Sequence, residues 1–116
     1  MRGTLMPDEI IIVNDGGNPS LREMLIESLK KFPNKPKVIY ARVDEDILWN
    51  YNGACNLGVW LSTGEYIFLQ DTDHIPDRTA YEKGVAALDA RPEIGRIAYY
   101  RKCVDVKDVF NKPMED

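Results

Sequence analysis

The sequence of 116 residues predicts one α/β domain with a mostly parallel sheet. Three observations lead to this fold class. Short β-branched runs alternate with amphipathic stretches along the chain. The runs are continuously apolar, as in strands that are buried on both faces. Turn-forming residues follow them. No internal repeat, linker or low-complexity segment divides the chain, so we treat 1–116 as a single domain.

The first predicted elements are a strand at residues 9–13 and a helix at 21–32. The strand is the run Glu-Ile-Ile-Ile-Val, which stops at an Asn-Asp-Gly-Gly turn. In the helix, apolar residues recur at helical spacing and form one stripe: Leu21, Met24, Leu25, Leu29 and Phe32. Its start is capped either by Ser20, in a capping box with Glu23, or by Asn18.

A second strand is predicted at residues 37–41 and a second helix at 53–61. The apolar positions of this helix again fall on one face: Ala54, Leu57, Gly58 and Leu61. Its two glycines each cost about 1 kcal/mol relative to alanine. We therefore expect close packing or the approach of a ligand at these glycines.

The second half of the chain is predicted to add a strand at 65–70, a helix that begins at Pro76, and a strand at 94–104. The run at 65–70 leads directly into Asp71 and Asp73. The following helix carries three apolar residues on one face, Tyr81, Val85 and Leu88. The complete order alternates strand and helix, as in a parallel sheet with crossover helices.

Acidic residues follow two of the predicted strands. Asp15 comes after the first strand, and Asp71 and Asp73 come after the third. Ligands of such sheets bind beyond the carboxyl ends of the strands, so we expect both groups to face one crevice. Two carboxylates at this spacing can share Mg²⁺ or Mn²⁺, with phosphate oxygens in other positions. Each group taken alone has a plainer interpretation as a solvated turn.

Composition narrows the classes of partner. The net charge is −4 with an isoelectric point near 5.0, and no basic stripe is present, which argues against a nucleic-acid partner. No apolar stretch reaches the roughly 18 residues of a membrane span, and no signal peptide is recognised. We expect a cytoplasmic protein. Cys55 and Cys103 belong to no CxxC pair and are expected to be reduced thiols. The sequence leaves a homo-oligomer open.

In their order, these motifs resemble the inverting family 2 glycosyltransferases, which share the GT-A fold. Residues 11–17 match the family's strand and V-D-D-G-S-like turn, and residues 54–58 match its A-R-N-x-G helix. Residues 64–73 match G-E-Y-I followed by D-x-D. The similarity covers residues 9–88. The resemblance implies a Rossmann-like GT-A sandwich of the nucleotide-diphospho-sugar transferases, truncated at both ends.

The resemblance also implies roles for individual residues. Asp15 would bind the uracil or other base of a nucleotide sugar, and Asn56 would line the nucleotide pocket. Asp73 would coordinate Mn²⁺ or Mg²⁺ bridging the diphosphate, and Asp71 would contact the ribose or donor sugar and help to hold the metal. His74 is a candidate third metal ligand, a phosphate contact or a turn cap. A UDP-sugar is the expected donor, with the acceptor unnamed.

The chain departs from the family pattern at several points. Asn14 stands where the family has its first Asp, and Cys55 stands where it has Arg. The opening P-x-Y-N strand of the family is not seen. No catalytic base is assigned, because 115–116, Glu-Asp, follow D-x-D too closely to match the family's base. Trp49 and Tyr51 either stack on a base or an acceptor or cover the core.

Three other interpretations remain open. A haloacid-dehalogenase-like phosphatase would use Asp71 as covalent nucleophile. However, Ile75 stands where that family has Thr or Val, and little chain follows. A receiver-like domain has an acidic pocket after its first strand, but its phosphoacceptor and downstream residues are not evident. The runner-up is a non-catalytic domain that binds a nucleotide or a protein partner.

Overall fold

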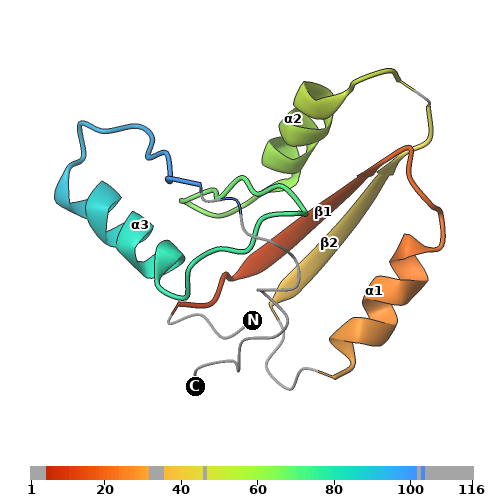
Figure 1. Ribbon diagram of the computed structural model, residues 1–116, viewed down its shortest axis with the longest axis horizontal. Helices are drawn as coiled ribbons and strands as arrows, with labels where there is room; N and C mark the ends of the chain where they lie inside the picture. Colours follow the sequence, from red (N-terminus) through yellow and green to blue (C-terminus); the bar gives the residue numbers. More distant parts are fainter. Residues whose placement is uncertain (1–4, 32–35, 46, 102, 104–116) are drawn as a thin grey trace.

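The computed structural model describes residues 5–31, 36–45, 47–101 and 103, which form an α/β arrangement of two strands and three helices. Strands alternate with helices in the first half, as predicted. The elements in chain order are β1 (Glu9–Asp15), α1 (Leu21–Leu29), β2 (Lys37–Val43), α2 (Tyr51–Leu61) and α3 (Ala80–Ala90) (Figure 1). Among the described residues, no helix is long and apolar enough to cross a lipid bilayer.

The two strands form a parallel pair. Their register runs from Glu9 opposite Lys37 to Asp15 opposite Val43, so both strands end at the same edge of the sheet. α1 connects them, because parallel neighbours need a crossover rather than a hairpin. α2 packs against β1, and a Cβ added to Gly58 would lie 3.6 Å from Val13 Cγ2. This is an ordinary van der Waals distance, so α2 lies against β1, but the packing would also admit an alanine at this position.

The strand predicted at 65–70 is wrong, since these residues pair with no other strand in the described part of the chain. Side-chain contacts with α3 and the chain after it hold the run instead. The ring of Phe68 lies 4.7 Å from that of Tyr81, edge to face, and 5.4 Å from that of Tyr99. The Tyr66 hydroxyl hydrogen-bonds to Asp89. A β-rich composition alone does not make a strand when no strand edge is within reach.

The other corrected expectations concern one further strand and the starts of two helices. The described part of 94–104 is also not a strand; residues 102 and 104 lie outside the described residues. Ser20 makes no side-chain cap at α1, so the capping box is wrong. Asn18 occupies that turn, and its Oδ1 accepts hydrogen bonds from the Ser20 N–H at 3.0 Å and hydroxyl at 2.9 Å. α3 begins at Ala80, four residues after Pro76, and Phe32 lies outside the described residues.

Few side chains are buried in the part of the chain that the structure describes. Ala80 is its one buried hydrophobic residue, and Asn14 its one buried polar residue. Trp49 is 91% exposed and Tyr51 is 53% exposed. The interpretation that these two aromatic residues cover the core is therefore wrong.

Asn14 organises the turn at the end of β1. Its side chain is only 5% exposed, and its Nδ2 donates to the Asn18 carbonyl at 3.0 Å and to the Tyr40 hydroxyl at 2.9 Å. Its Oδ1 accepts from the Gly17 N–H at 2.9 Å. An amide can donate and accept at once, whereas a carboxylate only accepts. This difference explains why Asn stands here in place of Asp.

We predict that Asn14→Asp destabilises the fold by about 1–3 kcal/mol at pH 7, because a buried carboxylate would face the Asn18 carbonyl without a donor. Burial raises the pKa of such a carboxyl group in the folded state. The loss should therefore shrink as the pH falls and the group is protonated. Urea unfolding at pH 7 and pH 4.5 measures both effects. An unchanged unfolding midpoint at pH 7 would contradict the assigned hydrogen bonds.

Glu9 ties the start of β1 to the segment after α2. Its Oε1 accepts from the Thr63 N–H at 2.6 Å and the Gly64 N–H at 3.2 Å, and its Oε2 accepts from the Thr63 hydroxyl at 3.1 Å. These hydrogen bonds lower the pKa of Glu9, and the bond from the Thr63 backbone N–H has the largest effect. The ionised form therefore contributes stability above the unfolded-state pKa.

We predict that this contribution is lost as the pH falls below about 4.3, the ordinary glutamate value, through the lower folded-state pKa. Glu9→Gln should therefore be less stable than wild type at pH 7, and the gap should close in acid. Thermal melts from pH 7 to pH 3 measure this convergence. Glu65→Gln, an exposed substitution outside the helices and strands, serves as control and should track wild type throughout.

Candidate functional site: an acidic loop beside the start of α2

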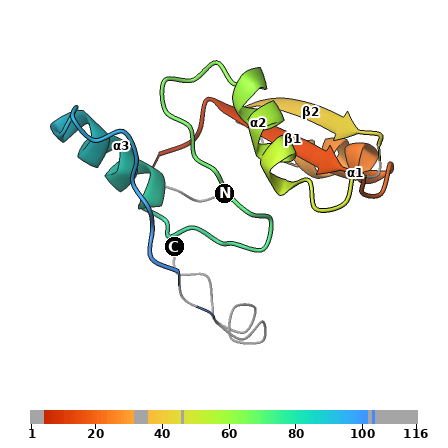
Figure 2. The ribbon, with the colours of Figure 1, turned by 90° about the horizontal axis from the view of Figure 1, so that it is seen from above.

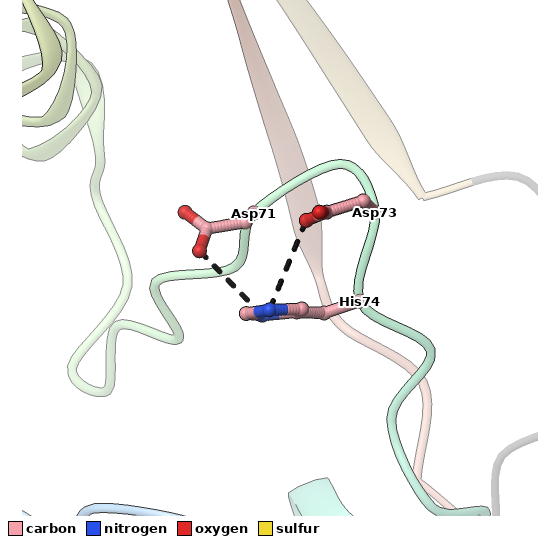
Figure 3. A group of neighbouring side chains, drawn as sticks. All are labelled: Asp71, Asp73 and His74. Atoms are coloured by element: carbon pink, nitrogen blue, oxygen red, sulfur yellow. Dashed lines mark ion pairs between the residues drawn. The ribbon is translucent and has the colours of Figure 1, made fainter. Parts of the chain in front are cut away.

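Asp71, Asp73 and His74 face one another on the loop that follows residues 65–70 (Figure 3). A backbone hydrogen bond of 3.1 Å from His74 N–H to the Asp71 carbonyl closes the turn. The imidazole lies between the two carboxylates. Its Nδ1 is 3.6 Å from Asp71 Oδ2, and its Nε2 is 3.8 Å from Asp73 Oδ1. Asp73 is 86% exposed, and the other two are roughly one-third exposed at their side chains.

This donor set fits a divalent cation. One ligand atom from each residue lies within 4.8 Å of the others. Neighbouring ligands of an octahedral ion such as Mg²⁺ are about 3 Å apart, so a modest contraction brings all three into its shell. The exposed side of Asp73 leaves room for further oxygen ligands, such as those of a phosphate.

Neighbouring polar side chains hold the acidic loop. Gln70 Nε2 donates to the His74 carbonyl at 2.9 Å, and Gln70 Oε1 accepts from the Tyr81 hydroxyl at 3.1 Å. The loop is thereby connected to α3. Arg101 Nη1 lies 3.4 Å from His74 Nε2 and brings a positive charge to the same place. A ligand with negative charge therefore meets a cationic side chain there as well as any bound metal.

Two consecutive residues at the start of α2 contact both acidic groups. Asn50 Nδ2 donates to Asp15 Oδ1 at 3.0 Å. The side chains of Cys55 and Asp71, which lie close to the Tyr51 hydroxyl, raise the pKa of Tyr51 to about 12. The structure therefore brings Asp15 and Asp71 to the same end of one helix, as the crevice prediction requires.

Two glycines make the surroundings of Asp15 possible. Gly16, directly after Asp15, has a φ of 70°, which glycine adopts without strain, and its N–H donates to the Val43 carbonyl at 3.1 Å. At Gly53, an added Cβ would overlap the Asn50 side chain. The glycine thus makes room for the side chain that holds Asp15.

Arg42 adds a cation at the same edge of the sheet. Its Nη2 donates to the Gly17 carbonyl at 3.5 Å, and its guanidinium also pairs with Asp44. Its Nε is buried and has no hydrogen-bond partner among the residues that the structure describes. Cys55, which stands where the family that the sequence resembles has an arginine, lies close to Tyr51. Arg42 nevertheless brings a positive charge from β2 to the turn that follows Asp15.

Asn56 is exposed on α2, and within the described chain it bonds to neither Asp15 nor Asp71. Its place in the nucleotide pocket stays a prediction. Residues 115–116 lie outside the described residues.

Sequence reasoning missed Asn50, Arg42 and Arg101. Asn50 has the sequence signal of a helix cap, and only the structure shows its side chain turned to Asp15.

Comparison with known proteins identifies the family. A family model, glycosyl transferase family 2, matches residues 2–112. The match includes β1, α2 and the acidic loop with all the side chains described above. Neither the curated proteins nor the solved structures gave a significant match. Since the family model covers nearly the whole sequence, the chain belongs to glycosyl transferase family 2, the members of which share the GT-A fold.

Proposed function

We propose that this domain binds a nucleotide-diphosphate sugar through a divalent cation and that the sugar is transferred to an acceptor. A UDP-sugar is the expected donor. The observation that carries the proposal is that Asp15 and Asp71 both lie at the start of α2. Asn50 contacts Asp15, and Tyr51 contacts Asp71. A nucleotide sugar needs two such groups, one for its base and one for its charged diphosphate.

Each acidic group suits one part of the donor. The Asp15 carboxylate accepts hydrogen bonds, as the N–H edge of uracil requires. Asp71, Asp73 and His74 offer the ligand set for a cation that receives the diphosphate. When bound, this cation supplies Lewis-acid stabilisation of the departing nucleoside diphosphate. Such a cation would offset the repulsion between these carboxylates and the phosphates of the donor.

The third ligand bears on the choice of metal. Oxygen ligands suit both Mg²⁺ and Mn²⁺, whereas an imidazole suits a transition ion better than Mg²⁺. His74 provides an imidazole between the two carboxylates. We therefore propose Mn²⁺ as the preferred ion of this site.

We predict that UDP binds in the presence of Mn²⁺ and that Asp73→Ala weakens this binding at least about tenfold, because even outer-shell partners of metal ligands are worth about 10–100-fold. Isothermal titration calorimetry with UDP, GDP and their sugar conjugates, with and without Mn²⁺, measures it. Asp8→Ala is the matched control. Asp8 is an exposed carboxylate just before β1, at the opposite end of that strand from Asp15.

Equal binding of UDP without metal would contradict the proposal, and so would an unaffected Asp73→Ala variant. Release of UDP from a UDP-sugar, by hydrolysis or transfer, distinguishes an active enzyme from a domain that only binds the nucleotide. Release of phosphate from an aryl phosphate, abolished by Asp71→Ala, would favour the phosphatase instead.

A separate prediction concerns His74. His74→Ala should weaken Mn²⁺ binding by about tenfold and Mg²⁺ binding by less, because only the transition ion gains from an imidazole ligand. Mn²⁺ titration followed by electron paramagnetic resonance gives the first affinity, and competition with Mg²⁺ gives the second. Equal losses for the two ions would show that His74 supports the loop rather than binding the metal.

A further inference from the structure

Trp49 combines an unusual backbone conformation with nearly complete exposure. Its φ of 55° makes it the one non-glycine residue with a positive φ in the described chain. A bulky residue is strained in this region, whereas glycine is not. The side chain is 91% exposed, so burial of the indole does not compensate for the strain. Strained residues that persist in a fold cluster at ligand sites.

The position of Trp49 connects this strain to the donor site. The next residue, Asn50, hydrogen-bonds to Asp15 at 3.0 Å, and the hydroxyl of the one after it, Tyr51, lies close to Asp71. Figure 1 shows that the segment between β2 and α2 lies beyond the ends of both strands. The indole is therefore attached at the rim of the site, on the side of Asp15.

We propose that Trp49 stacks on the nucleobase of the donor while Asp15 holds the edge of that base. This inference rests on the proposed function. A base that is hydrogen-bonded through its edge keeps two flat faces in water, and an aromatic ring covers one of them favourably. We assign the base of the donor to Trp49, because its neighbour Asn50 hydrogen-bonds to Asp15 and not to the acidic loop.

Tryptophan fluorescence tests the stacking directly, because the chain has two tryptophans. Trp60 is 80% exposed near the end of α2 and serves as the matched control. UDP with Mn²⁺ should quench the emission of Trp60→Phe, in which Trp49 is the remaining indole. The emission of Trp49→Phe should stay unquenched, and its affinity for UDP should remain within about threefold of wild type, since a phenyl ring still stacks.

Removal of the ring separates stacking from a structural role. Trp49→Ala should bind UDP about tenfold more weakly in calorimetry. Its affinity for pyrophosphate, which carries no base, should stay unchanged. Trp49→Gly should show the same weaker UDP binding together with a higher melting temperature, because glycine relieves the strain. A residue with only a structural role would not lose affinity while gaining stability.

The outcomes distinguish this inference from the function on which it rests. If wild type binds UDP with Mn²⁺ but Trp60→Phe shows no quenching, the stacking is wrong and the donor site stands. Equal losses of UDP and pyrophosphate affinity in Trp49→Ala would also overturn the stacking. If wild type binds no UDP at all, the proposed function and the inference both fail.

Discussion

The placement of the start of α2 is the constraint on which the rest of the site depends. Asn50 and Tyr51 are neighbours in sequence, and each reaches a different acidic group. This arrangement depends on the packing of α2 on β1, where Gly58 faces Val13. The absence of a side chain at Gly53 then leaves space for Asn50. Gly53, which weakens α2 as an isolated helix, therefore serves the position of the Asn50 side chain.

The elements that could be predicted from the sequence are those with a strong local pattern. β1, β2 and the three helices follow from apolar periodicity and turn residues, and their bounds shift by a few residues at most. Residues 65–70 have an equally strong apolar pattern and still form no strand. Pairing depends on a free strand edge elsewhere in space, and Phe68 finds Tyr81 and Tyr99 instead. A local pattern carries no information on that choice.

The candidate site could also be predicted only in part. The spacing of Asp71 and Asp73, and the turn at Asp15, mark the carboxylates in the sequence. The side chains that orient them do not stand out. An Asn before a helix is an ordinary cap, and the sequence does not show that Asn50 turns to Asp15 instead. Arg101 reaches His74 from 27 residues away, which no motif indicates.

The hydrogen bonds of Glu9 also bear on the order in which the domain folds. They join β1 to a segment 54 residues later, and the bond from Asn50 to Asp15 spans 35 residues. Contacts of such long range form after the local helices, because the entropy of closing a long loop must first be overcome. During synthesis, β1 has to wait for Thr63 to emerge from the ribosome. The acidic groups are therefore brought together only after Asp71 has also been made.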